Sequence, residues 1–130
     1  MSPANQAVQS AHSLADAIFK FRKEALTWHR ESNTLVLLDV ADQGELFMTL
    51  TQLKDTDIKF CPFYEPDFGG ELTAICLIPT EDTAESVKDF TKRFKLARLV
   101  PVAQQGERPA LNWKGERASR SGDAEPLNWA

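Results

Sequence analysis

A short segment between two apolar stretches gathers the residues of this chain best suited to catalysis. Residues 64–73 carry three carboxylates and two adjacent glycines. Glycine permits positive φ and close approach to the backbone, and catalytic groups are often placed on loops between rigid strands. Asp67 is the strongest candidate because it precedes the glycine pair, and Thr73 is next because it begins an otherwise apolar strand. The alternative is an ordinary polar loop whose acids face water.

A second set of polar residues lies near the start of the chain. Asn5, Gln9 and His12 are spaced four and three residues apart, so a helix presents them on one face. Such groups near a helix N-terminus suit contact with an anion or a phosphate. The alternative is that Gln9 and His12 satisfy buried backbone groups. Cys61 and Cys76 lie in apolar stretches and are interpreted as unreactive core residues.

Helices and strands must position these residues. Ser2 followed by Pro3 predicts a helix start, and an alanine-rich stripe predicts the packing face of that helix. The members of this stripe are Ala4, Ala7, Val8, Ala11, Leu14, Ala15 and Ile18. Asp42 and Glu45 form a capping-box pattern that predicts a second helix start. The expected strands cover residues 35–40, 58–63, 72–78 and 96–102, and a last helix begins at Thr80 or Asp82.

The order of these elements predicts an α/β protein, a small three-layer domain with a mixed sheet of about four strands flanked by helices. The strand–helix–strand passage favours a parallel pair. The alternative is a ferredoxin-like α+β fold over residues 34–102. We expect the domain to span residues 1–103 and residues 104–130 to form a flexible tail. The tail repeats Leu-Asn-Trp at 111–113 and 127–129, a candidate motif for docking to a protein partner.

Composition narrows the classes of function. The chain has 130 residues, and 15 Lys+Arg against 19 Asp+Glu give a net charge of −4, which argues against a globally basic nucleic-acid-binding protein. The sequence contains no glycine-rich nucleotide loop and no metal-binding motif, so no cofactor and no metal are expected. The first residues do not resemble a signal peptide, and no apolar run reaches the ~20 residues of a membrane helix. A cytoplasmic protein without membrane contact is therefore expected.

A local basic cluster stands apart from this acidic balance. It consists of Lys20, Arg22 and Lys23. The cluster is either a solvated helix face or a surface that contacts phosphates.

The segment Ala4–Ser13 resembles the Gly-Lys-x-Ala-Ala-Gln-x-x-His-Ala helix of type-two peptidyl-tRNA hydrolases, the archaeal and eukaryotic type. The similarity continues through Asp67-Phe68-Gly69, which resembles the Asp-x-Gly of the family's loop, through Glu71–Ala74 and to Lys95-Leu96. It covers roughly residues 4–99. The resemblance implies hydrolysis of the ester between a peptidyl or aminoacyl group and tRNA, without a metal.

The resemblance also implies roles for individual residues. The implied catalytic residues are Asp67, His12 and Thr73. The implied substrate-binding residues are Asn5, Gln9, Gly69, Lys20, Arg22 and Lys23, the last three on the tRNA backbone.

The chain departs from the family pattern at three places. Asn5 stands where the motif has lysine, Gly70-Glu71 replaces an Arg-Thr, and the family's first strand precedes the helix that opens this chain. Two other functions therefore stay open: a non-catalytic binding or adaptor domain of the same fold, and a ferredoxin-like small-ligand sensor. We further expect the incomplete sheet edge either to pair with a second copy, giving a homodimer, or to be covered by Leu96–Val102.

Overall fold

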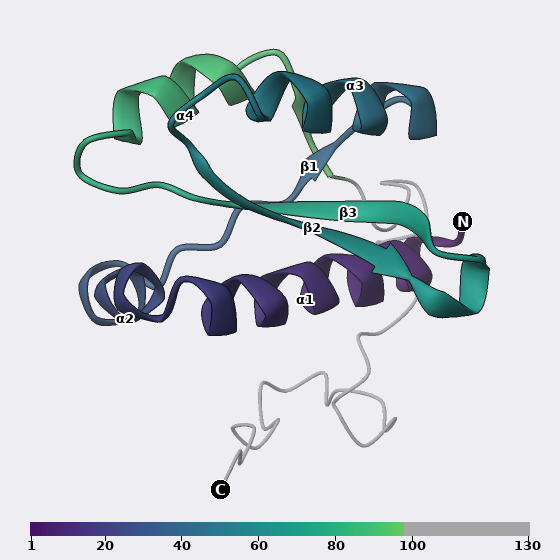
Figure 1. Cartoon of the computed structure of the whole chain (residues 1–130), viewed down its shortest axis with the longest axis horizontal. Helices are drawn as coiled ribbons and strands as arrows, with labels where there is room; N and C mark the ends of the chain where they lie inside the picture. Colours follow the sequence, from purple (N-terminus) through teal and green to yellow (C-terminus); the bar gives the residue numbers. More distant parts are fainter. Residues whose placement is uncertain (98–130) are drawn as a thin grey trace, which may run out of the picture. The chain divides into compact units, whose positions relative to one another are not determined.

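The strands form a middle layer between two layers of helices (Figure 1). The structure is a computed structural model, and it describes residues 1–97. Helices α1 (Pro3–Lys20) and α2 (Arg22–Glu31) lie on one side of the strands, and α3 (Gln43–Leu53) and α4 (Ala84–Thr91) lie on the other. This arrangement confirms the predicted small α/β domain with helices on both sides.

The strands pair differently from the prediction. β1 (Leu38–Asp39) pairs antiparallel with β4 (Lys95–Leu96), and β2 (Lys59–Glu65) pairs antiparallel with β3 (Glu71–Ile78). Within residues 1–97 no ladder joins the two pairs, so the expected mixed sheet with a parallel strand pair is wrong in that detail.

The reason lies in the apolar run that was expected to be a long strand. Only Leu38 and Asp39 of residues 35–40 are in a strand. Leu35 and Val36 are each 57% exposed, so this segment is not the doubly covered strand that its composition indicated. A two-residue strand offers too few backbone groups for a further parallel ladder.

From β1 onward the elements follow the order β-α-β-β-α-β, with a short 3-10 helix, η1 (Pro66–Phe68), between β2 and β3. This is the order of the ferredoxin-like alternative. Helices α3 and α4 lie together on one side of the strands, and α1 occupies the other side (Figure 1). From β1 onward the domain thus has the ferredoxin-like order of elements. The helices that precede β1 in the chain, α1 and α2, form the additional layer.

The edge of β1 is covered by the chain itself. Leu38 lies opposite Leu96, and the Ala97 N–H donates to the Leu37 carbonyl at 2.9 Å. The described start of the predicted covering segment, Leu96 and Ala97, thus lies beside β1. The rest of the predicted covering segment, the domain boundary at residue 103 and the predicted tail all lie outside the described residues.

Helix α1 packs on β2 and β3 through a face of small and polar residues. Gln9, Ser13 and Ala17 are buried, with exposed fractions of 5%, 2% and 0%. Two members of the predicted stripe, Val8 and Ile18, are instead 50% and 38% exposed. The buried face is therefore rotated from the prediction, because the short side chains of Ser13 and Ala17 let the helix backbone approach the sheet.

Two apolar clusters form the core, one on each face of the β2–β3 ladder. The first joins Ala17, Cys61 and Ile78, with Phe21 and Cys76 packed against it. It defines the α1-facing side of the ladder.

No helix described in residues 1–97 is long and apolar enough to cross a membrane.

The second cluster joins Leu53, Ile58 and Val87 on the side of α3 and α4. Ile75 and Leu77 of β3 pack against it. Alternate residues of this part of β3 therefore face opposite helical layers, as the pleat of a strand requires.

Candidate functional site

A β-bulge places Thr73 on the face of the ladder that α1 covers. Phe63 pairs with Ala74 and Tyr64 pairs with Leu72, so Thr73 is an extra residue in β3 without a partner in the ladder. Regular alternation would put Thr73 on the same face as Ile75, away from α1. The extra residue reverses that alternation, which is a common use of bulges.

A side chain of α3 also binds the start of β3. The Leu72 carbonyl accepts a hydrogen bond from Gln43 Nε2 at 3.3 Å. Gln43 is the first residue of α3. The two helical layers thus both contact the start of β3, α3 through Leu72 and α1 through Thr73.

Thr73 binds a glutamine of α1. Its Oγ1 donates to Gln9 Oε1 at 2.6 Å and lies 3.5 Å from the Phe63 carbonyl. Gln9 is 5% exposed. Within residues 1–97, Gln9 Nε2 makes no hydrogen bond, so the bond to Thr73 engages only the oxygen of this amide.

His12 lies beside this pair on the same helix. It follows Gln9 by three residues, which makes the two side chains neighbours on the helix surface. Its ring stacks on Phe63 with a centroid distance of 4.8 Å and an interplanar angle of 16°. His12 itself is exposed. The stack orients the imidazole of this exposed residue.

The loop with Asp67 is organised by a buried carboxylate. Glu65, which is 8% exposed, accepts a hydrogen bond from the Asp67 N–H through Oε1 at 3.2 Å. Gly69 ends the short helix η1 in the left-handed conformation, with φ 67°. Asp67 is exposed, and it lies in η1, which joins the end of β2 to the start of β3.

The remaining predicted residues lie along α1 and at its end. Asn5 is exposed one turn before Gln9, and its N–H is bound by Ser2 Oγ at 3.2 Å. Lys20 ends α1, and Arg22 and Lys23 begin α2. The basic cluster is thus about 17 Å from Gln9 along the helix axis. None of its three cations is in an ion pair within the described part of the chain.

The structure therefore brings Gln9, Thr73 and His12 together and leaves the basic cluster at a distance. Two contributors were missed from the sequence, namely Phe63 and Glu65. Glu65 carried a recognisable signal, because an acidic residue directly before proline is typical of a helix start. Phe63 carried none, since its contact with His12 depends on the packing of α1.

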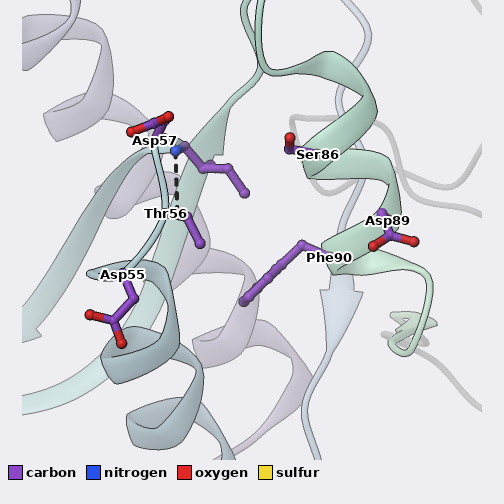
Figure 2. A pocket seen from close by; sticks show the side chains of 7 residues that line it. Asp55, Thr56, Asp57, Ser86, Asp89 and Phe90 are labelled. Carbon is purple, nitrogen blue, oxygen red and sulfur yellow. Dashed lines mark hydrogen bonds between the residues drawn. The ribbon is translucent and has the colours of Figure 1, made fainter.

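A separate hollow lies between α4 and the connection that joins α3 to β2 (Figure 2). Its volume is about 370 Å³, and its lining residues are Asp55, Thr56, Asp57, Ile58, Ser86, Asp89 and Phe90. Asp89 is bound by Lys92 at 2.6 Å, and this ammonium lowers the pKa of Asp89. The lining is acidic, but residues 1–97 contain no group of three or more His, Cys, Asp or Glu side chains arranged to bind a metal ion.

This hollow is distinct from the site around Gln9, because its residues belong to the α3 and α4 side of the ladder. We assign the candidate site to Gln9, His12, Thr73 and the Asp67 loop. Comparison of the chain with protein-family models, with curated proteins and with solved structures found no significant match.

Proposed function

We propose that this protein is a peptidyl-tRNA hydrolase-like enzyme that cleaves the ester between a peptidyl or aminoacyl group and tRNA. The observation that carries the proposal is the bond between Thr73 and Gln9. Ester hydrolysis develops negative charge on the carbonyl oxygen, and a preorganised N–H donor stabilises such an oxyanion. Because Thr73 occupies the Gln9 oxygen, the amide NH₂ is the group left for the substrate.

The proposed reaction needs a water molecule and an acceptor for its proton. Asp67 is the proposed acceptor, and His12 assists it. Both side chains are exposed, His12 on the same helix as Gln9 and Asp67 in η1 before β3. The water oxygen attacks the ester carbonyl, the bond to the tRNA ribose breaks, and the ribose oxygen takes up a proton. Gly69 leaves room for close approach of the substrate, since a Cβ built there meets nothing within 4 Å.

In this function the basic cluster of Lys20, Arg22 and Lys23 binds the phosphate backbone of the tRNA. These cations are exposed and available because no carboxylate pairs with them in residues 1–97. The substrate is made in the cytoplasm, so the proposal places the protein there. Binding should weaken as salt rises, and charge reversal at Arg22 and Lys23 should flatten that dependence.

The test is hydrolysis of N-acetylaminoacyl-tRNA by the full chain. Asp67→Asn is expected to lower turnover by at least about tenfold, and Gln9→Leu by about a hundredfold, as for the loss of an oxyanion donor. Asp57→Asn is the matched control, because Asp57 is also exposed but lies on the far side of the ladder. If the wild-type protein at micromolar concentration shows no turnover above background, the proposed hydrolase activity is refuted.

A non-catalytic tRNA-binding or adaptor domain is the second candidate. The observation that favours it is Asn5, which is exposed where the resembling motif has lysine, so the site has no cation of its own on this helix turn. Salt-dependent tRNA binding without hydrolysis would support this second function. Absence of both binding and hydrolysis would oppose both.

A further inference from the structure

Two cysteines lie directly opposite each other in the β2–β3 ladder. Cys61 pairs with Cys76, and both thiols are free. Both side chains belong to the cluster on the α1-facing side, so they point the same way. Directly opposed residues of antiparallel strands have Cα atoms about 4.5 or 5.5 Å apart. Both separations fall within the range of about 4.4–6.8 Å that a disulfide spans.

The surroundings of the pair leave the sulfur atoms without strong partners. The thiols contact neighbouring carbonyls, at 4.0 Å from Cys61 Sγ to Pro62 and 3.9 Å from Cys76 Sγ to Leu77. Ala17 of α1, which is fully buried, packs against this pair and adds only a methyl group. Nothing in these contacts opposes the approach of one sulfur to the other.

We propose that Cys61 and Cys76 are a redox modification site, which a small peroxide converts into a disulfide that joins β2 to β3 beneath α1. Cys76 is the first to react because it is only half-buried, whereas Cys61 is 7% exposed. Its thiolate attacks one peroxide oxygen, the O–O bond breaks, and a sulfenic acid and hydroxide form. The Cys61 sulfur then attacks the Cys76 sulfur, the S–O bond breaks and water leaves. Overall two thiols and one hydrogen peroxide give one disulfide and two waters.

The rate of this modification depends on pH. Burial raises the pKa of both thiols, and that of Cys76 rises to about 11 because the Cys61 sulfur adds to the effect. Lys20 lowers and Asp16 raises the pKa of Cys61 from the α1 side. The thiolate is the reactive form, so the reaction is slow at neutral pH and speeds up as the pH rises.

The test exposes the folded full chain to hydrogen peroxide at pH 7 and pH 9 and follows the intact mass. A loss of two hydrogens, with a peptide that links residues 61 and 76 under non-reducing digestion, is the expected product. Cys61→Ser and Cys76→Ser should each prevent it. In Cys61→Ser, the sulfenic acid on Cys76 should be captured by dimedone.

A matched control moves one thiol to the other face of the sheet. Cys76→Ser combined with Ile75→Cys keeps two thiols but places the second among the α3 and α4 contacts. Because the two Cβ atoms of this variant point to opposite faces, a disulfide needs movement of the backbone, and it should form at least about tenfold more slowly. Equal rates in the two proteins would show that the native register does not bring the thiols together. Over-oxidised thiols without a disulfide, or a disulfide only between chains, would also overturn the proposal.

Discussion

Replacing Thr73 by valine removes one hydroxyl and keeps the shape of the side chain. The bond from Thr73 Oγ1 to Gln9 Oε1, 2.6 Å long, is lost, and the oxygen of a residue that is 5% exposed loses its partner. A buried polar group left without a hydrogen bond costs about 1–3 kcal/mol. We therefore expect Thr73→Val to lower the free energy of unfolding by about 2 kcal/mol, which lowers the thermal midpoint by about 10 °C in a domain of this size.

The measurement is urea and thermal unfolding followed by circular dichroism, with a matched threonine as control. Thr51 is exposed, and its Oγ1 donates to the Phe47 carbonyl within α3 at 3.1 Å. Thr51→Val should cost less than about 0.5 kcal/mol. The pair Gln9→Leu and Thr73→Val should be non-additive by at least about 0.5 kcal/mol, because the double variant leaves no unpaired oxygen. Equal costs for the two threonines, or an additive cycle, would refute the assigned bond.

Four further outcomes follow from other features of the structure. Asp42→Ala should destabilise by about 1 kcal/mol in urea unfolding, because Asp42 Oδ1 caps α3 by accepting from the Glu45 N–H at 2.8 Å; an unchanged midpoint would contradict the cap. Gly69→Ala should cost about 1 kcal/mol from the positive φ of 67° alone, and a stabilised variant would contradict that conformation. Alkylation of Cys76 by iodoacetamide, measured in Cys61→Ser, should rise about tenfold per pH unit from pH 7 to pH 9, since burial keeps its pKa above the ordinary 9.0; a rate already constant by pH 8 would contradict this. For the same reason the free energy of unfolding should fall above pH 9, because the unfolded thiol loses its proton before the folded one.

Local signals in the sequence predicted the starts of α1 and α3. The start of α4 was predicted wrongly, because this helix follows Thr83 rather than Thr80 or Asp82. Ser2 caps α1 through the Asn5 N–H, as the Ser-Pro pattern indicated. At α3 the Glu45 carboxylate reaches back to the Ala41 N–H at 3.1 Å, one residue earlier than the capping-box pattern places it. Such signals are readable because a cap depends on residues within one turn of each other.

The buried face of α1 and the bulge in β3 were not predictable in the same way. A helix rich in alanine carries little hydrophobic contrast, so periodicity could not rank Gln9 and Ser13 above Val8 as the packed face. Thr73 looked like an ordinary member of a strand, since a bulge is specified by the pairing of two strands rather than by one. Thr73 and Gln9 were each singled out from the sequence, but their contact depends on both of these features together.

The extra residue in β3 has a consequence for how such a site arises and disappears. Phe63 would still pair with Ala74, and Tyr64 with Leu72, if Thr73 were deleted. A single-codon deletion would thus leave every other pair in register and remove the hydroxyl that orients Gln9. A substitution at position 73 cannot produce this regular ladder, because the new residue would still be an extra residue in β3. Among descendants of this gene, loss of the site by such a deletion would appear as a one-residue gap in the alignment, and a comparison that scores only matched columns would overlook it.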